Sequence, residues 1–211
     1  IDQAGIEPTW VSGISIGSIN AAIVAGNPPE KRVERLHDFW DTVCRPPSMS
    51  ASFMTEAANM MGMGFAPFQE SIKPTLVRLG DFERLHHKDD LRSSLGATNV
   101  GTGNFVFFDN RHMKIGPEHV MASGSLPPGF PATEIDGEFY WDGGCVSNTP
   151  LLYIMNESNN QDSLIFQVDL WSAHGKLPSN IFEVTERQKD IQYSSRTRAV
   201  TDLVRNMHRM R

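Results

Sequence analysis

The pentapeptide Gly13–Gly17, with the sequence Gly-Ile-Ser-Ile-Gly, constrains the fold of this chain more than any other feature. It follows a short β-prone run, Thr9–Ser12, and precedes a helix-forming run, Ser18–Ala25, that a glycine terminates. A nucleophilic serine between a strand and a helix projects from a sharp turn, and glycines two positions either side of it remove Cβ atoms that would clash there. The pattern therefore predicts a strand, a tight turn at Ser15 and a helix.

Ser15 would stand at the N-terminus of that helix, where the helix dipole favours developing negative charge. The backbone N–H of Ile16 is then placed to donate a hydrogen bond to an oxyanion. The same pentapeptide is also compatible with a glycine-rich turn in which the serine only caps the helix.

The rest of the chain alternates between patterns typical of strands and of helices. Asn27-Pro28-Pro29-Glu30 supplies a cap, a proline at the first helical position and an acid, and predicts a second helix that runs to about residue 43. The predicted strands are 95–100, 105–108, 133–135 and 138–141, the last two joined by an Asp136-Gly137 hairpin signal. Leu164–Val168 is typical of a strand buried in a parallel sheet with helices on both faces. Asn180 and Glu183 form a capping pair before a final amphipathic helix. These patterns predict an α/β fold.

The composition fits a folded protein and argues against a nucleic-acid-binding one. The chain has 211 residues, of which 39% are hydrophobic and 21% charged, as in ordinary soluble domains. Its formal net charge of −6 disfavours binding to phosphates, which depends on a basic surface. Residues 186–211 differ, because they carry seven basic and three acidic residues, a local charge of +4. We therefore expect an acidic body, a basic C-terminal helix and no nucleic-acid partner.

The two cysteines indicate neither a disulfide framework nor a metal site. Cys44 and Cys145 lie far apart and form neither a CxxC motif nor a zinc ligand set. We therefore expect a reducing, cytoplasmic compartment, no metal and no other cofactor. No stretch reaches the roughly 20 apolar residues of a membrane span, so we expect any membrane contact to be peripheral.

A nucleophilic serine needs a base within hydrogen-bond reach, and the sequence offers two candidates. Asp142, in Trp141-Asp142-Gly143-Gly144, ends a β-prone run, and the two glycines let backbone pass close to another group. An aspartate held against the hydroxyl can serve alone as the base, although these residues are also typical of an ordinary Asp-Gly turn. Among seven histidines, His174 follows a strand-like run in a loop suited to a histidine-containing triad.

Four segments together resemble the patatin-like phospholipase family. They occur in the family's order and are Gly13–Ala22, Met121–Pro131, Tyr140–Gly144 and Ser147–Pro150. The family uses a Ser–Asp dyad without histidine, so the resemblance implies Ser15 as the nucleophile and Asp142 as the general base. It also implies a three-layer α/β/α sheet with helices on both faces. Residues 186–198 are similar to the C-terminal extension of a bacterial branch of the family.

One family feature is missing from the sequence. The family's oxyanion hole includes a Gly-Gly-Gly-x-x-Gly type loop after the first strand, upstream of the serine, and no such loop precedes Ser15. The resemblance therefore implies a catalytic domain over residues 1–172 that lacks its N-terminal strand and glycine-rich loop, followed by a helical basic extension over residues 173–211. Two alternatives stay open: a non-catalytic lipid-binding protein with this fold, and an α/β-hydrolase esterase with a histidine triad.

The function implied by the resemblance is serine-dependent hydrolysis of a lipid ester, as by a phospholipase A or another carboxylic ester hydrolase of lipid metabolism. Ile16 and the glycines of both motifs would support the dyad with their backbone. Phe53–Phe65 and Leu126–Phe130 are candidate walls of an acyl-chain groove. The basic terminal helix is suited to contact with anionic lipid headgroups at a membrane surface.

Overall fold

The computed structural model describes residues 4–44, 66–86, 91–158 and 162–209. Residue contacts divide the chain into two compact units, Ile1–Val146 (unit 1) and Ser147–Arg211 (unit 2). The predicted domain boundary at residue 172 stays a prediction. The predicted groove segment Phe53–Phe65 lies outside the described residues.

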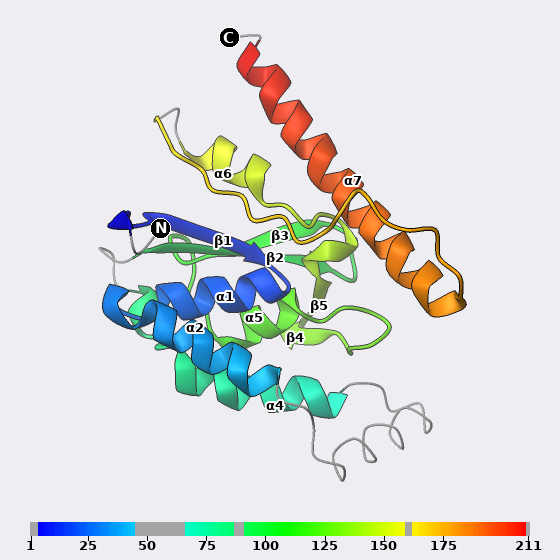
Figure 1. Ribbon diagram of the computed structural model, residues 1–211. Coiled ribbons are helices and arrows are strands. Elements are labelled where there is room, and N and C mark those ends of the chain that lie inside the picture. The colour runs from blue at the N-terminus through cyan, green and yellow to red at the C-terminus, as the bar shows by residue number, and fades with distance from the viewer. Residues whose placement is uncertain (1–3, 45–65, 87–90, 159–161, 210–211) are drawn as a thin grey trace. The chain divides into compact units, whose positions relative to one another are not determined.

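Unit 1 is built on a mixed five-stranded sheet (Figure 1). Its strands are β1 (Trp10–Ile14), β2 (Arg92–Asn99), β3 (Phe105–Asp109), β4 (Thr133–Ile135) and β5 (Glu138–Asp142). Strand β2 pairs in parallel with β1 and antiparallel with β3 and β5, while β4 and β5 form a hairpin. Asp136 and Gly137 both have positive φ angles, 52° and 82°, as the predicted hairpin turn requires. All the strands predicted within unit 1 are confirmed.

Strands β1 and β5 lie end to end along the same edge of β2. Strand β3 occupies the other edge along most of β2, which leaves one edge for both β1 and β5. On that edge β1 pairs as far as Gly96, opposite Ile14, and β5 pairs from Ala97, opposite Asp142. Because β1 runs parallel and β5 antiparallel to β2, the C-terminal ends of β1 and β5 meet.

The four helices in the described part of unit 1 pack in two tiers on the sheet (Figure 1). Helices α1 (Ile16–Ala25) and α5 (Pro117–Ser123) contact the strands, and α2 (Pro29–Val43) and α4 (Ala66–Leu79) pack against them. The described residues of the unit also include two short 3-10 turns, η2 (Arg84–His86) and η3 (Gly143–Cys145). The two predicted helices are confirmed, and so is the α/β fold class.

Apolar side chains between these helices and the sheet form the core of unit 1. Ile23 of α1, Leu95 of β2 and Val120 of α5 are almost fully buried, as are Phe39 of α2 and Leu76 of α4. Fully burying such a side chain contributes about 1.5–3 kcal/mol. These contacts fix α1 and α5 on the sheet, and so fix the residues at the ends of these helices.

The side chain of Asn27 does not cap α2 as its sequence context predicts. The N-cap of α2 is Pro28, which makes no side-chain cap. Instead, Asn27 Nδ2 donates to the carbonyl oxygens of Ile23, at 2.8 Å, and Leu79, at 2.6 Å. It satisfies carbonyl groups near the C-terminal ends of α1 and α4, where a helix cannot pair its own carbonyls.

Unit 2 consists of α6 (Leu151–Glu157), an irregular segment over residues 162–180 and the long helix α7 (Ile181–Arg209). The predicted capping pair at the start of α7 is confirmed, because the Glu183 N–H donates to Asn180 Oδ1 at 3.0 Å. None of the helices among the described residues is long and apolar enough to cross a membrane.

The prediction of a buried strand over Leu164–Val168 is wrong. These residues form no strand, and the side chains of Leu164 and Val168 are 75% and 84% exposed. A β-strand exists only where a neighbouring strand accepts and donates its backbone hydrogen bonds, and none of the strands among the described residues pairs with this segment. An apolar run alone therefore did not determine its conformation.

The buried histidine of α5 gives a prediction about stability. His119 is 5% exposed, its Nδ1 accepts from the Gly116 N–H at 2.9 Å, and burial lowers its pKa despite the opposing charge of Glu118. The folded state therefore favours neutral His119, and the unfolded state takes up a proton first as the pH falls below about 6.5. We expect wild-type stability to fall relative to His119→Gln below this pH, by at most about 1.4 kcal/mol per pH unit.

Urea unfolding of both proteins at a series of pH values between about 5 and 7.5 measures this difference. All other titrating groups are shared by the two proteins, so the difference isolates His119. Parallel stability curves across this range would contradict the prediction.

Candidate active site

Ser15 occupies the sharp turn between β1 and α1. Its backbone has φ 57° and ψ −124°, a positive φ that residues other than glycine rarely adopt and that costs of order 1–3 kcal/mol. The Ser15 carbonyl accepts hydrogen bonds from the N–H of Ser18 at 2.9 Å and from its Oγ at 2.6 Å. The predicted strand, turn and helix are thus present, with the half-buried serine held at the turn.

The two glycines of the pentapeptide serve the turn in different ways. A Cβ atom on Gly13 would overlap the Gly17 carbonyl and lie 2.6 Å from the Ser18 nitrogen, so only glycine fits at position 13. A Cβ atom on Gly17 would meet nothing within 4 Å. The predicted steric reason therefore holds for Gly13 and is wrong for Gly17, whose carbonyl is the group that Gly13 approaches.

Asp142 ends β5 and reaches the same point of the sheet as Ser15. Its carboxylate accepts a hydrogen bond from the Gly144 N–H at 2.7 Å, and the Ser15 side chain lies close enough to stabilise the ionised form. Its backbone is fixed as well, because Thr98 Oγ1 donates to the Asp142 carbonyl at 3.1 Å. The structure thus brings together the two side chains that the sequence analysis singled out, which lie 127 positions apart in the sequence.

Burial controls the electrostatics of Asp142. The residue is 1% exposed, and this desolvation raises the pKa of its carboxyl above the ordinary value of 3.8. Hydrogen bonds from Ser15 and Gly144 act in the opposite direction, because they stabilise the ionised form. A carboxylate with a raised pKa is a stronger proton acceptor than a solvated one.

Gly143 allows the close approach of β5 to the centre of the sheet. A Cβ atom on Gly143 would lie 2.6 Å from the Gly96 carbonyl oxygen and 3.0 Å from Ile14 Cγ2. A larger residue would push the end of β5 away from β2 and from the end of β1. The backbone support that the sequence predicts from Gly143 and Gly144 therefore has two physical origins: close packing and a hydrogen bond to Asp142.

Sequence reasoning missed the role of Ser123, the last residue of α5. The Ser15 N–H donates to Ser123 Oγ at 3.0 Å, and the Asp142 N–H donates to the Ser125 carbonyl at 2.9 Å. Both residues belong to the Met121–Pro131 segment that carries part of the family resemblance. The family resemblance was the only sequence signal that pointed to Ser123 and Ser125. It did not indicate which groups these residues would bond to.

The remaining candidates from the sequence are Ile16, His174 and the segment Leu126–Phe130. Ile16 is the first residue of α1, where backbone N–H groups have no partner within the helix. His174 lies in unit 2, is exposed, and its N–H donates to Ser172 Oγ at 3.2 Å. Leu126–Phe130 forms a partly buried turn after α5, and its assignment to an acyl groove stays a prediction. Among the residues that the structure describes, no group of three or more His, Cys, Asp or Glu side chains could hold a metal ion.

Comparison with known proteins agrees with this geometry. The family model described as patatin-like phospholipase matches residues 1–155, whereas no curated protein matches the chain. The matched range includes the Ser15 turn, the α5 segment and the end of β5. Because the match covers well over half of the chain, the protein belongs to the patatin-like phospholipase family, a family of lipid hydrolases.

Proposed function

We propose that the protein is a serine-dependent lipid acyl hydrolase, a phospholipase A or related carboxylic ester hydrolase, that uses Ser15 and Asp142 as a catalytic dyad. The observation that carries this proposal is that Ser15, directly after β1, and the buried Asp142, at the end of β5, meet where these two strands pair with adjacent residues of β2. A hydroxyl on a strained turn and a desolvated base in contact with it are the two parts that nucleophilic attack on an ester requires.

The reaction begins when Asp142 accepts the proton of Ser15 and the serine Oγ attacks the acyl carbonyl carbon. The tetrahedral intermediate collapses, the ester C–O bond breaks, and Asp142 returns the proton to the leaving alcohol. A water molecule then gives a proton to Asp142 and attacks the acyl-enzyme. The second tetrahedral intermediate collapses, the bond between the acyl carbon and Ser15 Oγ breaks, and Asp142 returns the proton to Ser15 Oγ as the fatty acid leaves. The carboxylate acts as base and acid in turn, so the cycle needs neither a histidine nor a cofactor.

Two features favour the charge that develops in this reaction. The Ile16 N–H, at the first position of α1, is available to donate to the oxyanion, and the positive end of the helix dipole adds to its effect. The raised pKa of Asp142 brings its basicity closer to that of the groups it must deprotonate. We assign the oxyanion role to Ile16 and backbone support to Gly13, Gly17, Gly143 and Gly144.

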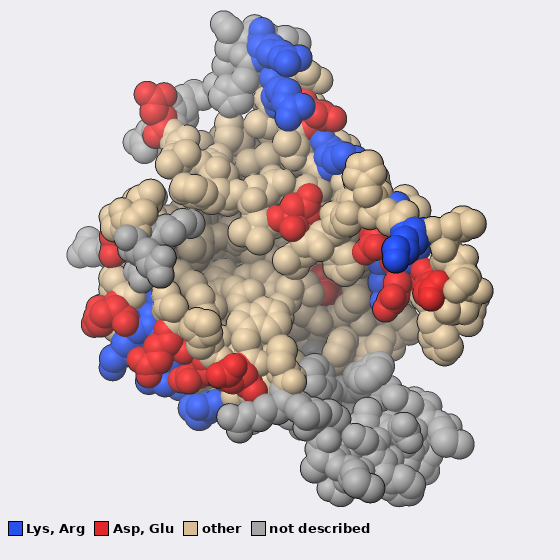
Figure 2. All heavy atoms as spheres, in the orientation of Figure 1, with Lys and Arg blue, Asp and Glu red and all other residues tan. Residues whose placement is uncertain are grey.

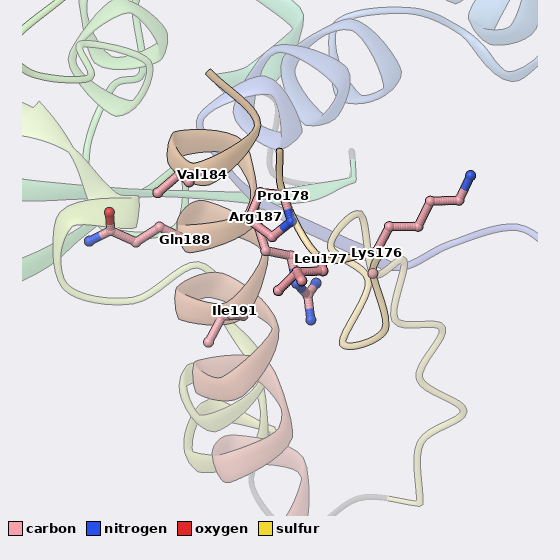
Figure 3. A pocket seen from close by; sticks show the side chains of 8 residues that line it. Lys176, Leu177, Pro178, Val184, Arg187, Gln188 and Ile191 are labelled. Atoms are coloured by element: carbon pink, nitrogen blue, oxygen red, sulfur yellow. The ribbon is translucent and has the colours of Figure 1, made fainter. Parts of the chain in front are cut away.

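We also propose that unit 2 contacts a lipid surface. Leu177, Val184 and Ile191 line an open hollow of about 650 Å³ beside the first turns of α7, and Lys176 extends away from it (Figure 3). Leu177 and Phe182, the second residue of α7, are 93% and 80% exposed. Along α7, Figure 2 shows basic side chains interspersed with acidic ones, and the sequence gives residues 186–211 a net charge of +4. Exposed apolar side chains beside a basic helix suit an anionic lipid interface in the cytoplasm.

Replacement of either dyad residue should remove most of the activity. We expect Ser15→Ala and Asp142→Asn each to lower kcat/KM for a short p-nitrophenyl ester by at least about 10³-fold in the full-length protein, because each removes a reacting group. Asp142→Asn should fold at neutral pH at least as stably as the wild type. A raised pKa of the Asp142 carboxyl means that the folded state binds the proton more tightly than the unfolded state does. The free energy of unfolding therefore falls as the pH rises and the carboxyl ionises. Asparagine does not ionise, so the variant avoids this loss.

Two controls accompany these variants. Asp136→Asn changes an aspartate of the β4–β5 turn, where asparagine tolerates the positive φ, and should leave hydrolysis unchanged. His174→Ala should also leave it unchanged, whereas a histidine triad would require its loss. Hydrolysis that survives Ser15→Ala, or a wild type that binds lipid without Ser15-dependent hydrolysis, would support the alternatives instead.

The raised pKa of Asp142 predicts a shifted acid limb in the pH profile. Because the base must be ionised, we expect kcat/KM for a neutral ester to fall as the pH decreases through a midpoint above 3.8, the ordinary pKa of aspartate. His119→Gln should leave this midpoint unchanged. That result would show that the midpoint reports the ionisation of the Asp142 carboxyl and not that of the buried histidine. A midpoint at or below 3.8 would refute the assignment of Asp142 as a desolvated base.

The lipid contact predicts a selective loss of vesicle binding. Fully burying one large apolar side chain contributes about 1.5–3 kcal/mol, so we expect the double variant Leu177→Ser/Phe182→Ser to bind vesicles of phosphatidylcholine and phosphatidylglycerol at least about tenfold more weakly. Val77→Ser, which changes an exposed apolar residue of α4 in unit 1, should bind as the wild type does. Co-sedimentation measures both, and equal binding of the double variant and the wild type would disprove the contact.

A further inference from the structure

The hydroxyl of Ser123 makes two hydrogen bonds beneath the Ser15 turn. It accepts from the Ser15 N–H at 3.0 Å and donates to the Gly96 carbonyl at 2.6 Å. Ser123 is fully buried, so no solvent replaces either bond. A hydroxyl can accept and donate at the same time, and this one joins the end of α5, the middle of β2 and the nucleophile turn.

The same short segment also holds the other member of the dyad. The Ser125 carbonyl accepts from the Asp142 N–H at 2.9 Å. Ser125 is fixed in turn, because its Oγ donates to the Met121 carbonyl at 2.8 Å and lies 2.8 Å from Thr133 Oγ1. The residues Ser123–Ser125 therefore bind the backbone of both Ser15 and Asp142, which arrive on strands running toward each other.

The Gly96 carbonyl provides a second connection between the two sides. It accepts the hydrogen bond of Ser123, and it is also the group that approaches Gly143, where a Cβ atom would lie only 2.6 Å from its oxygen. The orientation of this carbonyl therefore affects both the Ser15 turn and the residue that follows Asp142.

We propose that Ser123 is a positioning residue for the hydrolysis assigned above to Ser15 and Asp142, and the inference rests on that proposed function. Ser123 holds the Ser15 N–H, and with it the positive φ from which the serine side chain reaches the Asp142 carboxylate. It acts through the backbone of the nucleophile and does not itself contact the reacting atoms.

The test removes the hydroxyl and follows both catalysis and the turn. Ser123→Ala removes the acceptor of the Ser15 N–H and one donor to the Gly96 carbonyl, so the turn can relax and move the nucleophile from its base. We expect kcat for a short p-nitrophenyl ester to fall by about 10–100-fold while KM changes by less than about twofold. Hydrogen exchange of the Ser15 amide should become at least about tenfold faster, since its acceptor is lost.

Ser93→Ala is the matched control. Ser93 is also fully buried and lies in β2, the strand that contains Gly96, but its Oγ has no hydrogen-bond partner among the described residues. Its replacement should change neither kcat nor the exchange of the Ser15 amide. Ser123→Thr retains the hydroxyl and should restore most of the lost kcat. If Ser123→Ala does not fold, Ser123→Cys, with a weak donor of similar size, serves in its place.

The outcomes separate the two proposals. A Ser123→Ala enzyme with wild-type kcat and wild-type exchange of the Ser15 amide would overturn the positioning role while leaving the dyad intact. Equal losses of kcat in Ser123→Ala and Ser93→Ala would also overturn it, since they would indicate general destabilisation. If the wild type shows no Ser15-dependent hydrolysis, the proposed function fails, and the amide exchange still decides whether Ser123 holds the turn.

Discussion

The shared edge of β2 is the constraint on which the site depends. One edge of this strand pairs first with β1 and then with β5, which run in opposite directions, so their last residues face each other at Gly96 and Ala97. The chain leaves β1 through Ser15 and leaves β5 through Asp142, and the two side chains meet without any loop having to carry them there. The relative position of Ser15 and Asp142 is therefore set by strand register, which changes only in steps of whole residues.

This arrangement has a cost in stability that the rest of unit 1 must offset. Ser15 adopts a positive φ, Asp142 is a buried ionisable group, and Gly13 and Gly143 exclude side chains at two close contacts. Each of these features is unfavourable or neutral for folding by itself. Together they produce a hydroxyl held against a desolvated carboxylate, which is useful for nucleophilic attack on an ester. The same residues that form the candidate site thus lower, or fail to increase, the stability of the fold.

Local patterns in the sequence predicted the elements whose conformation is decided locally. The Ser15 turn, helix α1 and the Asp136-Gly137 hairpin follow from residue types within a few positions, because glycine and aspartate favour backbone angles that others avoid. Predictions failed where a distant partner decides the outcome. Asn27 bonds to the ends of two helices rather than capping its own, and Leu164–Val168 has no strand beside it among the described residues. The bond of Ser123 to Ser15 spans 108 positions, so no local pattern could reveal it.

The four segments that resemble the family fall into two groups, according to the unit in which they make their contacts. Three of them, Gly13–Ala22, Met121–Pro131 and Tyr140–Gly144, meet around Ser15 and Asp142 in unit 1. The fourth, Ser147–Pro150, serves unit 2: Asn148 Nδ2 donates to Thr197 Oγ1 at 2.9 Å, and Thr149 Oγ1 lies 2.8 Å from the same oxygen. Both bonds end on α7, the helix that carries the basic residues of the tail. The Ser147–Pro150 motif therefore bonds to α7 through its polar side chains, which accounts physically for the polar residues Asn148 and Thr149 at these positions.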